Sequence, residues 1–314
     1  LLRVHQGIGP GHAVHGLSMN DGYTYRERIN QRGAGRAVHV YLSGRYTHSS
    51  AADWLQHIEA GRVRVDGAPT TADAVLELRQ ELTWHRPPWE EPAAPLALPV
   101  LIEDDAFVVV AKPPGLPTMP GGGFLEHTLV HQLRLRSPHA SPTHRLGRWT
   151  SGAVLCSRSK AAGAHIAAQF SGRTIHKRYR ALATGRPATT EFGVDVPIGP
   201  VPYAPLGTVH AANPTGRHAS SRVRVVEQRE GCCVCHVTIA TGRPHQIRIH
   251  LAAAGHPLVG DPLYGVGGLP LPGGTAVPGD PGYHLHAAEL GFRHPRTDGP
   301  LVVKAPLPAG DPSA

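Results

Sequence analysis

The sequence predicts an α+β protein with a mainly antiparallel mixed sheet, preceded by a small α/β module. Three observations carry this prediction. Apolar runs typical of strands recur from about residue 100 onward, few segments between them have helical spacing, and a proline-rich stretch separates them from a short module of helix and strands. We therefore expect two domains of unequal size.

The composition indicates a soluble protein that binds polyanions. The chain has 314 residues, 31 Lys and Arg against 23 Asp and Glu, and a formal net charge of +8. A basic surface attracts nucleic acid, although an arginine-rich composition alone gives the same balance. No run reaches the ~18 apolar residues that a membrane span needs, so we expect no membrane partner.

The first part of the chain divides into an extension, a module and a linker. Residues 1–18 lack helical or strand periodicity, and we expect the extension at residues 1–36 to be poorly structured. Residues 37–86 form the module: a helix with Ser50 as N-cap and Asp53 in its first turn, then strands around an Asp66-Gly67 turn. The prolines of residues 87–99 predict a linker.

The large domain is expected at residues 100–306, followed by a tail at 307–314. VLIEDDAFVVVAK, AVLCSRS, RTIHKRYRALATG, SSRVRVVEQ, CCVCHVTIA and YHLHAAELGF read as strands, and HTLVHQLRLR and SKAAGAHIAAQFSG read as helices. This pattern, rich in strands with a few helices, is typical of an α+β domain.

The cysteines predict neither a disulfide framework nor a metal site. Cys156, Cys232, Cys233 and Cys235 are few and clustered, which favours a reducing, cytoplasmic environment. Cys232 and Cys235 have the spacing of a metal-ligand pair, but on a strand residues three apart point to opposite faces. We expect no metal.

One motif is dense in donors and glycines. Residues 144–152 read HRLGRWTSG and contain no carboxylate. Together with EDDAFVVVAKPPGL, KRYRALATG and TGRPHQIRIHLAAAGHPLVGDPLYG, this order resembles the RluA family of RNA pseudouridine synthases, over about residues 37–304. The module at 37–86 resembles the S4 RNA-binding domain that often precedes this catalytic domain.

The resemblance implies a cytoplasmic, monomeric enzyme that isomerises uridine to pseudouridine in structured rRNA or tRNA without a cofactor. The base leaves C1′, turns and rejoins through C5, so it must first leave its stack. By the motif match, Arg145 enters the vacated helix, Tyr179 lies against the uracil and serves as base, and Arg248 pairs with the active-site carboxylate. The remaining RNA contacts are expected from Arg148, Lys177, Arg178, His245 and Gln246.

The chain departs from the family at its central residue. The family pattern is HRLDRxTSG, and Gly147 stands where that pattern has its essential Asp. Glycine offers no nucleophile or base. Gly147 has three possible explanations: another acid rescues catalysis, the protein binds RNA without turnover, or this copy carries an altered residue. The candidates for a rescuing acid, Asp195 and Asp261, match family positions that look structural, and neither is an obvious substitute. A non-catalytic RNA-binding protein is therefore the alternative, and a DNA-binding module is a third reading.

The motif match also predicts a geometry. Gly147 should lie at the floor of a basic cleft beside the Tyr179 ring and the Arg248 guanidinium. Arg248 should then lack the family's carboxylate and leave a cationic hole for water, an anion or a substitute acid. An Asp at position 147 should reach Arg248 and raise or restore isomerisation.

Overall fold

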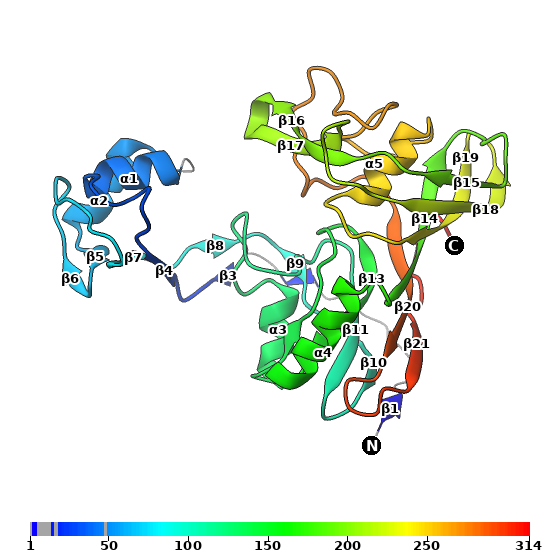
Figure 1. Ribbon diagram of the computed structural model, residues 1–314, viewed down its shortest axis with the longest axis horizontal. Coiled ribbons are helices and arrows are strands. Elements are labelled where there is room, and N and C mark those ends of the chain that lie inside the picture. The colour runs from blue at the N-terminus through cyan, green and yellow to red at the C-terminus, as the bar shows by residue number, and fades with distance from the viewer. Residues whose placement is uncertain (1, 5–13, 16–17, 47–48) are drawn as a thin grey trace. The chain divides into compact units, whose positions relative to one another are not determined.

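The computed structural model describes residues 2–4, 14–15, 18–46 and 49–314. Contacts divide the chain into two compact units (Figure 1). The small unit spans residues 17–91, and the large unit combines residues 92–314 with the residues before 17. Each unit has its own hydrophobic core. Residues 1, 5–13 and 16–17 of the expected N-terminal extension lie outside the described residues.

The small unit is an antiparallel sheet of order β4-β7-β5-β6, as far as the chain is described, with two helices packed on it. Trp54, Val38 and Val63 are fully buried between helices and sheet. The elements are β4 (Tyr23–Arg28), α1 (Val38–Arg45), α2 (Ala51–Glu59), β5 (Val63–Val65), β6 (Ala68–Pro69) and β7 (Glu81–Arg86).

Local signals in this unit are confirmed. The Ser50 hydroxyl accepts from the Asp53 N–H, and the Asp53 carboxylate accepts from the Ser50 N–H, so a complete capping box begins α2. Asp66 and Gly67 both have left-handed φ, 49° and 81°, which suits the tight turn between β5 and β6.

The expectation that residues 1–36 are poorly structured is wrong for its second half. Strand β4 pairs with β7 along its whole length, from Tyr23 opposite Arg86 to Arg28 opposite Glu81. The sequence YTYRER has no aliphatic residue and alternates polar groups with tyrosines, so its apolar pattern is weak. Pairing with β7 decides its conformation.

The proline-rich stretch joins the two units, and some of its residues form short paired strands. β8 (Glu90–Glu91) pairs with β3 (Ser18–Met19), and β9 (Ala94–Pro95) pairs with β2 (Val14–His15). The Asn20 amide also donates to the buried Glu91 carboxylate at 2.8 Å. The boundary between the units falls after Glu91.

The large unit is built on one mixed sheet of eleven strands in the described chain, ordered β1-β10-β11-β13-β20-β14-β19-β18-β15, with β12 and β21 added beside β13 and β20. Every neighbouring pair is antiparallel except β13–β20. The strands are β1 (Arg3–Val4), β10 (Val100–Glu103), β11 (Phe107–Lys112), β12 (Ser141–Pro142), β13 (Ser151–Ser157), β14 (His176–Thr184), β15 (Glu191–Val194), β18 (Ser221–Arg229), β19 (Cys232–Ile239), β20 (Leu285–Arg293) and β21 (Pro300–Lys304). The predicted α+β class with a mainly antiparallel mixed sheet is confirmed.

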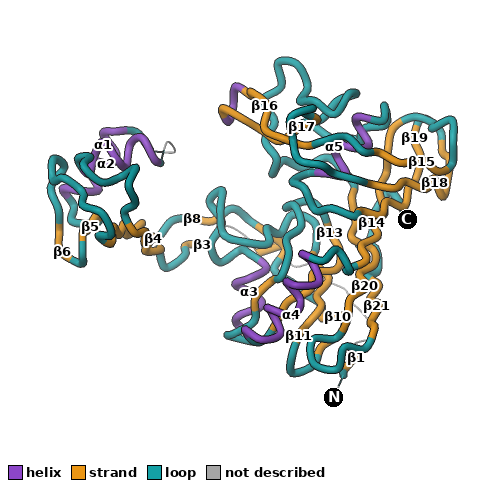
Figure 2. The backbone as a smooth tube through the Cα atoms, viewed as in Figure 1, coloured by secondary structure: helices purple, strands orange, loops and turns teal. Residues whose placement is uncertain are grey.

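The helices divide between the two halves of this sheet (Figure 1). α4 (Lys160–Ser171) packs on β13 and β20, α3 (Leu129–Arg136) lies at β12, and α5 (Gln246–Ala253) lies at β15 and at the hairpin of β16 and β17. The hairpin strands are β16 (Ile198–Tyr203) and β17 (Gly207–Ala212), joined by the 3-10 turn η1 (Ala204–Leu206). A long loop, residues 254–284, leads from α5 to β20 (Figure 2).

The residues expected as a C-terminal tail belong to the large unit. The Arg180 side chain donates to the Ser313 carbonyl at 2.7 Å, and Arg229 donates to the Ala314 carbonyl at 2.8 Å. Ser313 is buried. These contacts join distant segments, so the sequence gives no local sign of them.

The parallel contact of β13 with β20 requires a glycine in the 144–152 motif. Gly152 has φ +110°, and a Cβ there would lie 2.3 Å from the Ala287 carbonyl oxygen. Because that neighbour is backbone, a side chain could be accepted only if the strands moved apart. The final Gly of the motif therefore fixes where the motif loop meets the second half of the sheet.

We expect Gly152→Ala to lower the free energy of unfolding by at least about 2 kcal/mol, because strain and overpacking add. Urea denaturation followed by circular dichroism measures this change. Gly193→Ala is the matched control, since its Cβ would meet only one atom, 4.0 Å away. Equal stabilities of the two variants would contradict the role of Gly152.

Candidate active site

A buried lysine holds the motif loop in place. Lys112 ends β11, and its ammonium donates to the carbonyls of Pro113, Leu116 and Arg148 at 2.9, 2.7 and 2.9 Å. Burial, and then the charge of Arg148, lowers the pKa of Lys112 well below its usual value. These three bonds connect the loop after β11 to the 144–152 motif.

The structure brings Gly147, Tyr179 and Arg248 to one pocket of about 100 Å³. Gly147 comes from the loop before β13, Tyr179 from β14 and Arg248 from α5. Arg145, Leu146, Thr150, Ile239, His245, Gln246, Ile247, Tyr283 and Leu285 complete its lining. The predicted meeting of the three motifs is therefore confirmed as geometry, while the roles of their residues stay predictions.

Tyr179 is a buried phenol on the pocket wall. It lies opposite Val237 of β19 and Ala287 of β20, and 8% of it is exposed. Burial raises the pKa of Tyr179 to about 12. The phenol of the free protein is therefore protonated at neutral pH.

Arg248 has a carboxylate partner, so of the occupants expected beside it the structure has an acid, Asp261. Its Nε and Nη2 donate to the two oxygens of Asp261, both at 2.7 Å, and its Nη1 donates to the Pro278 carbonyl. The side chains are 2% and 0% exposed. A guanidinium this deeply buried requires a countercharge, and Asp261 supplies it.

The Asp261 carboxylate has a structural role, because its oxygens accept hydrogen bonds only from within the protein. Its Oδ1 also accepts from the N–H groups of Leu263 and Tyr264. Asp261 does not line the pocket, and neither Asp nor Glu occurs among the described residues that do. Asp261 therefore holds Arg248 from behind and presents no oxygen to a substrate.

Two other predicted RNA contacts support α5. The Gln246 amide donates to the Ser220 carbonyl and the Ser221 hydroxyl, and its oxygen accepts from the Thr241 hydroxyl. These bonds within the protein occupy the side chain that was predicted to contact RNA. His245 lies at the start of α5 with φ 53°, and its Nδ1 is 2.6 Å from the Tyr264 hydroxyl. Burial, followed by the charge of Arg248, lowers the pKa of His245 to about 3, so its ring is neutral.

Of the predicted cations, Arg145 lines the pocket and is exposed. Arg148 does not line it, because its Nε donates to the Gly115 carbonyl and its guanidinium lies over Phe124. Arg178 pairs with Glu289 at 2.6 Å, and Lys177 has a pKa lowered by burial. The structure thus leaves Arg145 as the predicted arginine that faces the opening.

The sequence analysis missed two polar residues at this pocket, Tyr283 and Thr150. The Tyr283 ring lies under the Arg248 guanidinium at 4.1 Å, and its hydroxyl is 3.4 Å from Thr150 Oγ1. A Cβ at position 147 would lie 3.0 Å from that hydroxyl. Thr150 stood within the quoted motif, but nothing in the sequence indicated that Tyr283 would reach Gly147.

We expect Asp261→Asn to lower the free energy of unfolding by about 3–5 kcal/mol, because it leaves the buried Arg248 charge without its partner. Chemical denaturation measures the change. The exposed Asp195 provides the control, since Asp195→Asn should shift stability by no more than about 0.5 kcal/mol. A small effect at both positions would show that the pair does not stabilise the fold.

Comparisons with known proteins identify the family of this chain. The family model for RNA pseudouridylate synthase matches residues 106–253. An uncharacterized RNA pseudouridine synthase of Synechocystis is 42% identical over 85% of this chain and 93% of its own, and ribosomal large subunit pseudouridine synthase D of Xanthomonas campestris is 34% identical over 88% and 86%. The solved structure of human RNA pseudouridylate synthase domain containing 1 matches with a TM-score of 0.55 and 26% identity, over 69% of this chain and 86% of its own. The chain therefore belongs to the RNA pseudouridine synthase family, whose members are isomerases that act on RNA.

Proposed function

We propose that this protein converts uridine to pseudouridine in structured ribosomal RNA. The observation that carries the proposal is the pocket that unites the 144–152 motif with Tyr179 and Arg248. The resemblance to a synthase named for the large ribosomal subunit favours rRNA over tRNA. The reaction exchanges one bond of the uracil for another, so it needs no redox partner or cofactor.

The pocket suits a base taken out of its stack. Arg145 is exposed at its opening, where a guanidinium can enter the gap that a flipped base leaves. The Tyr179 ring and the side chains of Ile239 and Leu285 offer apolar surface for the faces of a uracil. The Arg248 guanidinium, which Asp261 holds in place at the pocket, stabilises the negative charge that develops on the detached base.

A second candidate function is RNA binding without turnover. Gly147 favours it, because no carboxylate lines the pocket in the described chain and the nearby Asp261 is held by Arg248. Such a protein would use the same cleft and the same charges. The two candidates differ in one observable, which is the formation of pseudouridine.

Mapping pseudouridine in rRNA and tRNA from cells with and without the gene separates the candidates. We expect at least one uridine of rRNA to lose its modification without the gene, and purified protein to restore it. Tyr179→Phe should bind the RNA as tightly but form far less product, because the phenol is lost and the ring is kept. Identical maps would leave RNA binding as the function, and activity gained by Gly147→Asp would then locate the defect at that residue.

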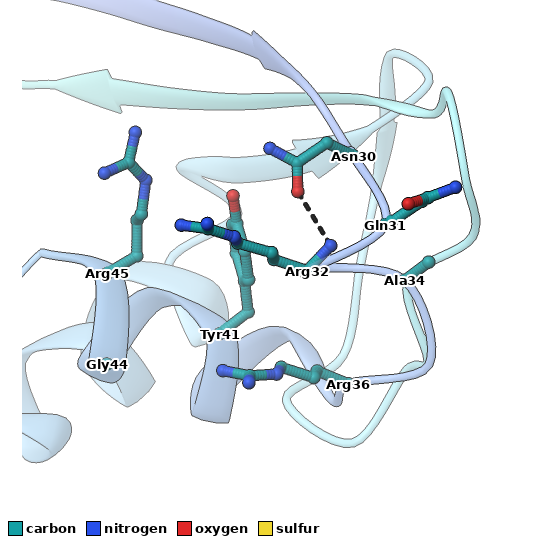
Figure 3. Close-up of a pocket in the computed structure, with 8 residues that line it drawn as sticks. All are labelled: Asn30, Gln31, Arg32, Ala34, Arg36, Tyr41, Gly44 and Arg45. Carbon is teal, nitrogen blue, oxygen red and sulfur yellow. Dashed lines mark hydrogen bonds between the residues drawn. The ribbon is translucent and has the colours of Figure 1, made fainter.

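The small unit supplies a further basic surface, and we propose that it holds RNA as an S4-like domain does. A hollow of about 520 Å³ is lined by Asn30, Gln31, Arg32, Ala34, Arg36, Tyr41, Gly44 and Arg45. Figure 3 shows three arginine side chains around it, and the Arg32 N–H bonded to the Asn30 side chain. Arginines at a hollow beside a phenol suit phosphates and an adjacent base.

Neutralising this hollow should weaken RNA binding in a salt-dependent way. For Arg32→Ala/Arg36→Ala, we expect the slope of log K against log salt concentration to become shallower by about 1–2, because up to two phosphate contacts disappear. Arg62→Ala/Arg64→Ala removes the same charge from the same unit outside the hollow and should change the slope less. Filter binding over a salt series decides, and equal slopes for both double variants would contradict the proposal.

A further inference from the structure

The hydroxyl of Tyr283 lies beside the place that a side chain at position 147 would fill. A Cβ built on Gly147 would lie 3.0 Å from Tyr283 Oη and 3.3 Å from Thr150 Oγ1. The φ of Gly147 is not in the left-handed region, so the backbone itself does not require glycine there. The chain thus combines a missing carboxylate with a phenol oxygen directed at the same point.

The phenol is held firmly in this position. Tyr283 is 4% exposed, and it precedes β20, whose start is tied to the motif by the parallel pairing of Gly152 with Ala287. The Arg248 guanidinium lies 4.1 Å from the centre of its ring and is itself fixed by Asp261. A cation fixed against the ring stabilises negative charge that develops on the phenol oxygen.

The other nucleophiles near the pocket are less suitable. The Asp261 carboxylate is fully buried behind Arg248. Thr150 Oγ1 lies within reach of position 147, but an alkoxide is a far poorer anion than a phenolate, and no base stands beside it in the described lining. Tyr179 lies on another strand, and its oxygen is not among the atoms that approach position 147.

Resting on the proposed function, we propose that Tyr283 replaces the missing carboxylate as the nucleophile of this enzyme. A tyrosine oxygen is an established nucleophile at anomeric carbons, where the transition state resembles an oxocarbenium ion. The C1′ of uridine is such a carbon. Tyr283 thereby becomes a catalytic residue that the family motif does not contain.

The proposed steps balance without a further reactant. Tyr283 Oη bonds to C1′ as the bond from C1′ to N1 breaks, and the phenol proton passes to the leaving uracil. The detached uracil turns, its C5 bonds to C1′, and the bond from C1′ to Oη breaks to give a phenolate. Tyr179 then takes the proton from C5 as it gives its own proton to the phenolate, which yields pseudouridine and restores both phenols.

The test uses the full chain and the RNA in which mapping finds its pseudouridine. Tyr283→Phe keeps the ring under Arg248 and removes only the oxygen, so we expect product formation to fall at least about 1,000-fold while RNA affinity and thermal stability are kept. Tyr203→Phe is the matched control. Its buried hydroxyl lies outside the pocket and donates to the Gly274 and Ala276 carbonyls, so its loss should leave the rate unchanged.

Two further measurements identify the nucleophile. Adding Gly147→Asp to Tyr283→Phe should return activity, because a carboxylate then occupies the vacated place; a merely structural role of the hydroxyl predicts no rescue. Denaturing a single-turnover reaction of the wild type before it is complete stops the reaction while C1′ is still bonded to Oη. Mass spectrometry should then find ribose attached to the peptide that contains Tyr283.

The outcomes separate this inference from the proposed function. Product formation by the wild type that persists in Tyr283→Phe overturns the nucleophile and leaves the enzyme intact. Loss of product without an adduct on Tyr283 also overturns it. A wild type that forms no pseudouridine in any RNA overturns both.

Discussion

The buried pair of Arg248 and Asp261 is the interaction on which the active site depends. Both charges lie out of water, so each is tolerable only because the other is within hydrogen-bond distance. The pair joins α5 to the loop that follows it, and the guanidinium also lies over the rings of Tyr264 and Tyr283. One ion pair therefore positions α5, the loop that follows it and Tyr283 near the end of that loop.

A second set of constraints brings the motif loop to that pair. The Lys112 ammonium donates a hydrogen bond to the Arg148 carbonyl, and Gly152 allows β13 to approach the backbone of β20 closely. Since Tyr283 lies two residues before the start of β20, the same strand contact that places Gly147 also places the phenol beside it. Backbone pairing thus places the motif loop and Tyr283, and the ion pair places Arg248.

These constraints explain how the pocket keeps its form with a glycine at position 147. The fold at this point depends on Arg248, Asp261, Lys112 and Gly152, none of which requires a side chain at position 147. A glycine at position 147 therefore costs the fold nothing, and the proposed nucleophile, Tyr283, has its oxygen beside the place that a side chain there would fill. The proposed nucleophile and the intact pocket follow from the same geometry.

The sequence by itself determined the α+β class, the capped helix at Ser50, the turn at Asp66-Gly67 and the motifs that meet at the pocket, because these depend on local periodicity and on short patterns. It did not determine strand β4, whose residues lack an apolar pattern and depend on β7. Only the tertiary structure decided that Asp261 holds Arg248 and that Tyr283 faces Gly147. Thr150 and Tyr283 are 133 positions apart, and a contact over that distance is set by strand pairing, which leaves no sign in either segment alone.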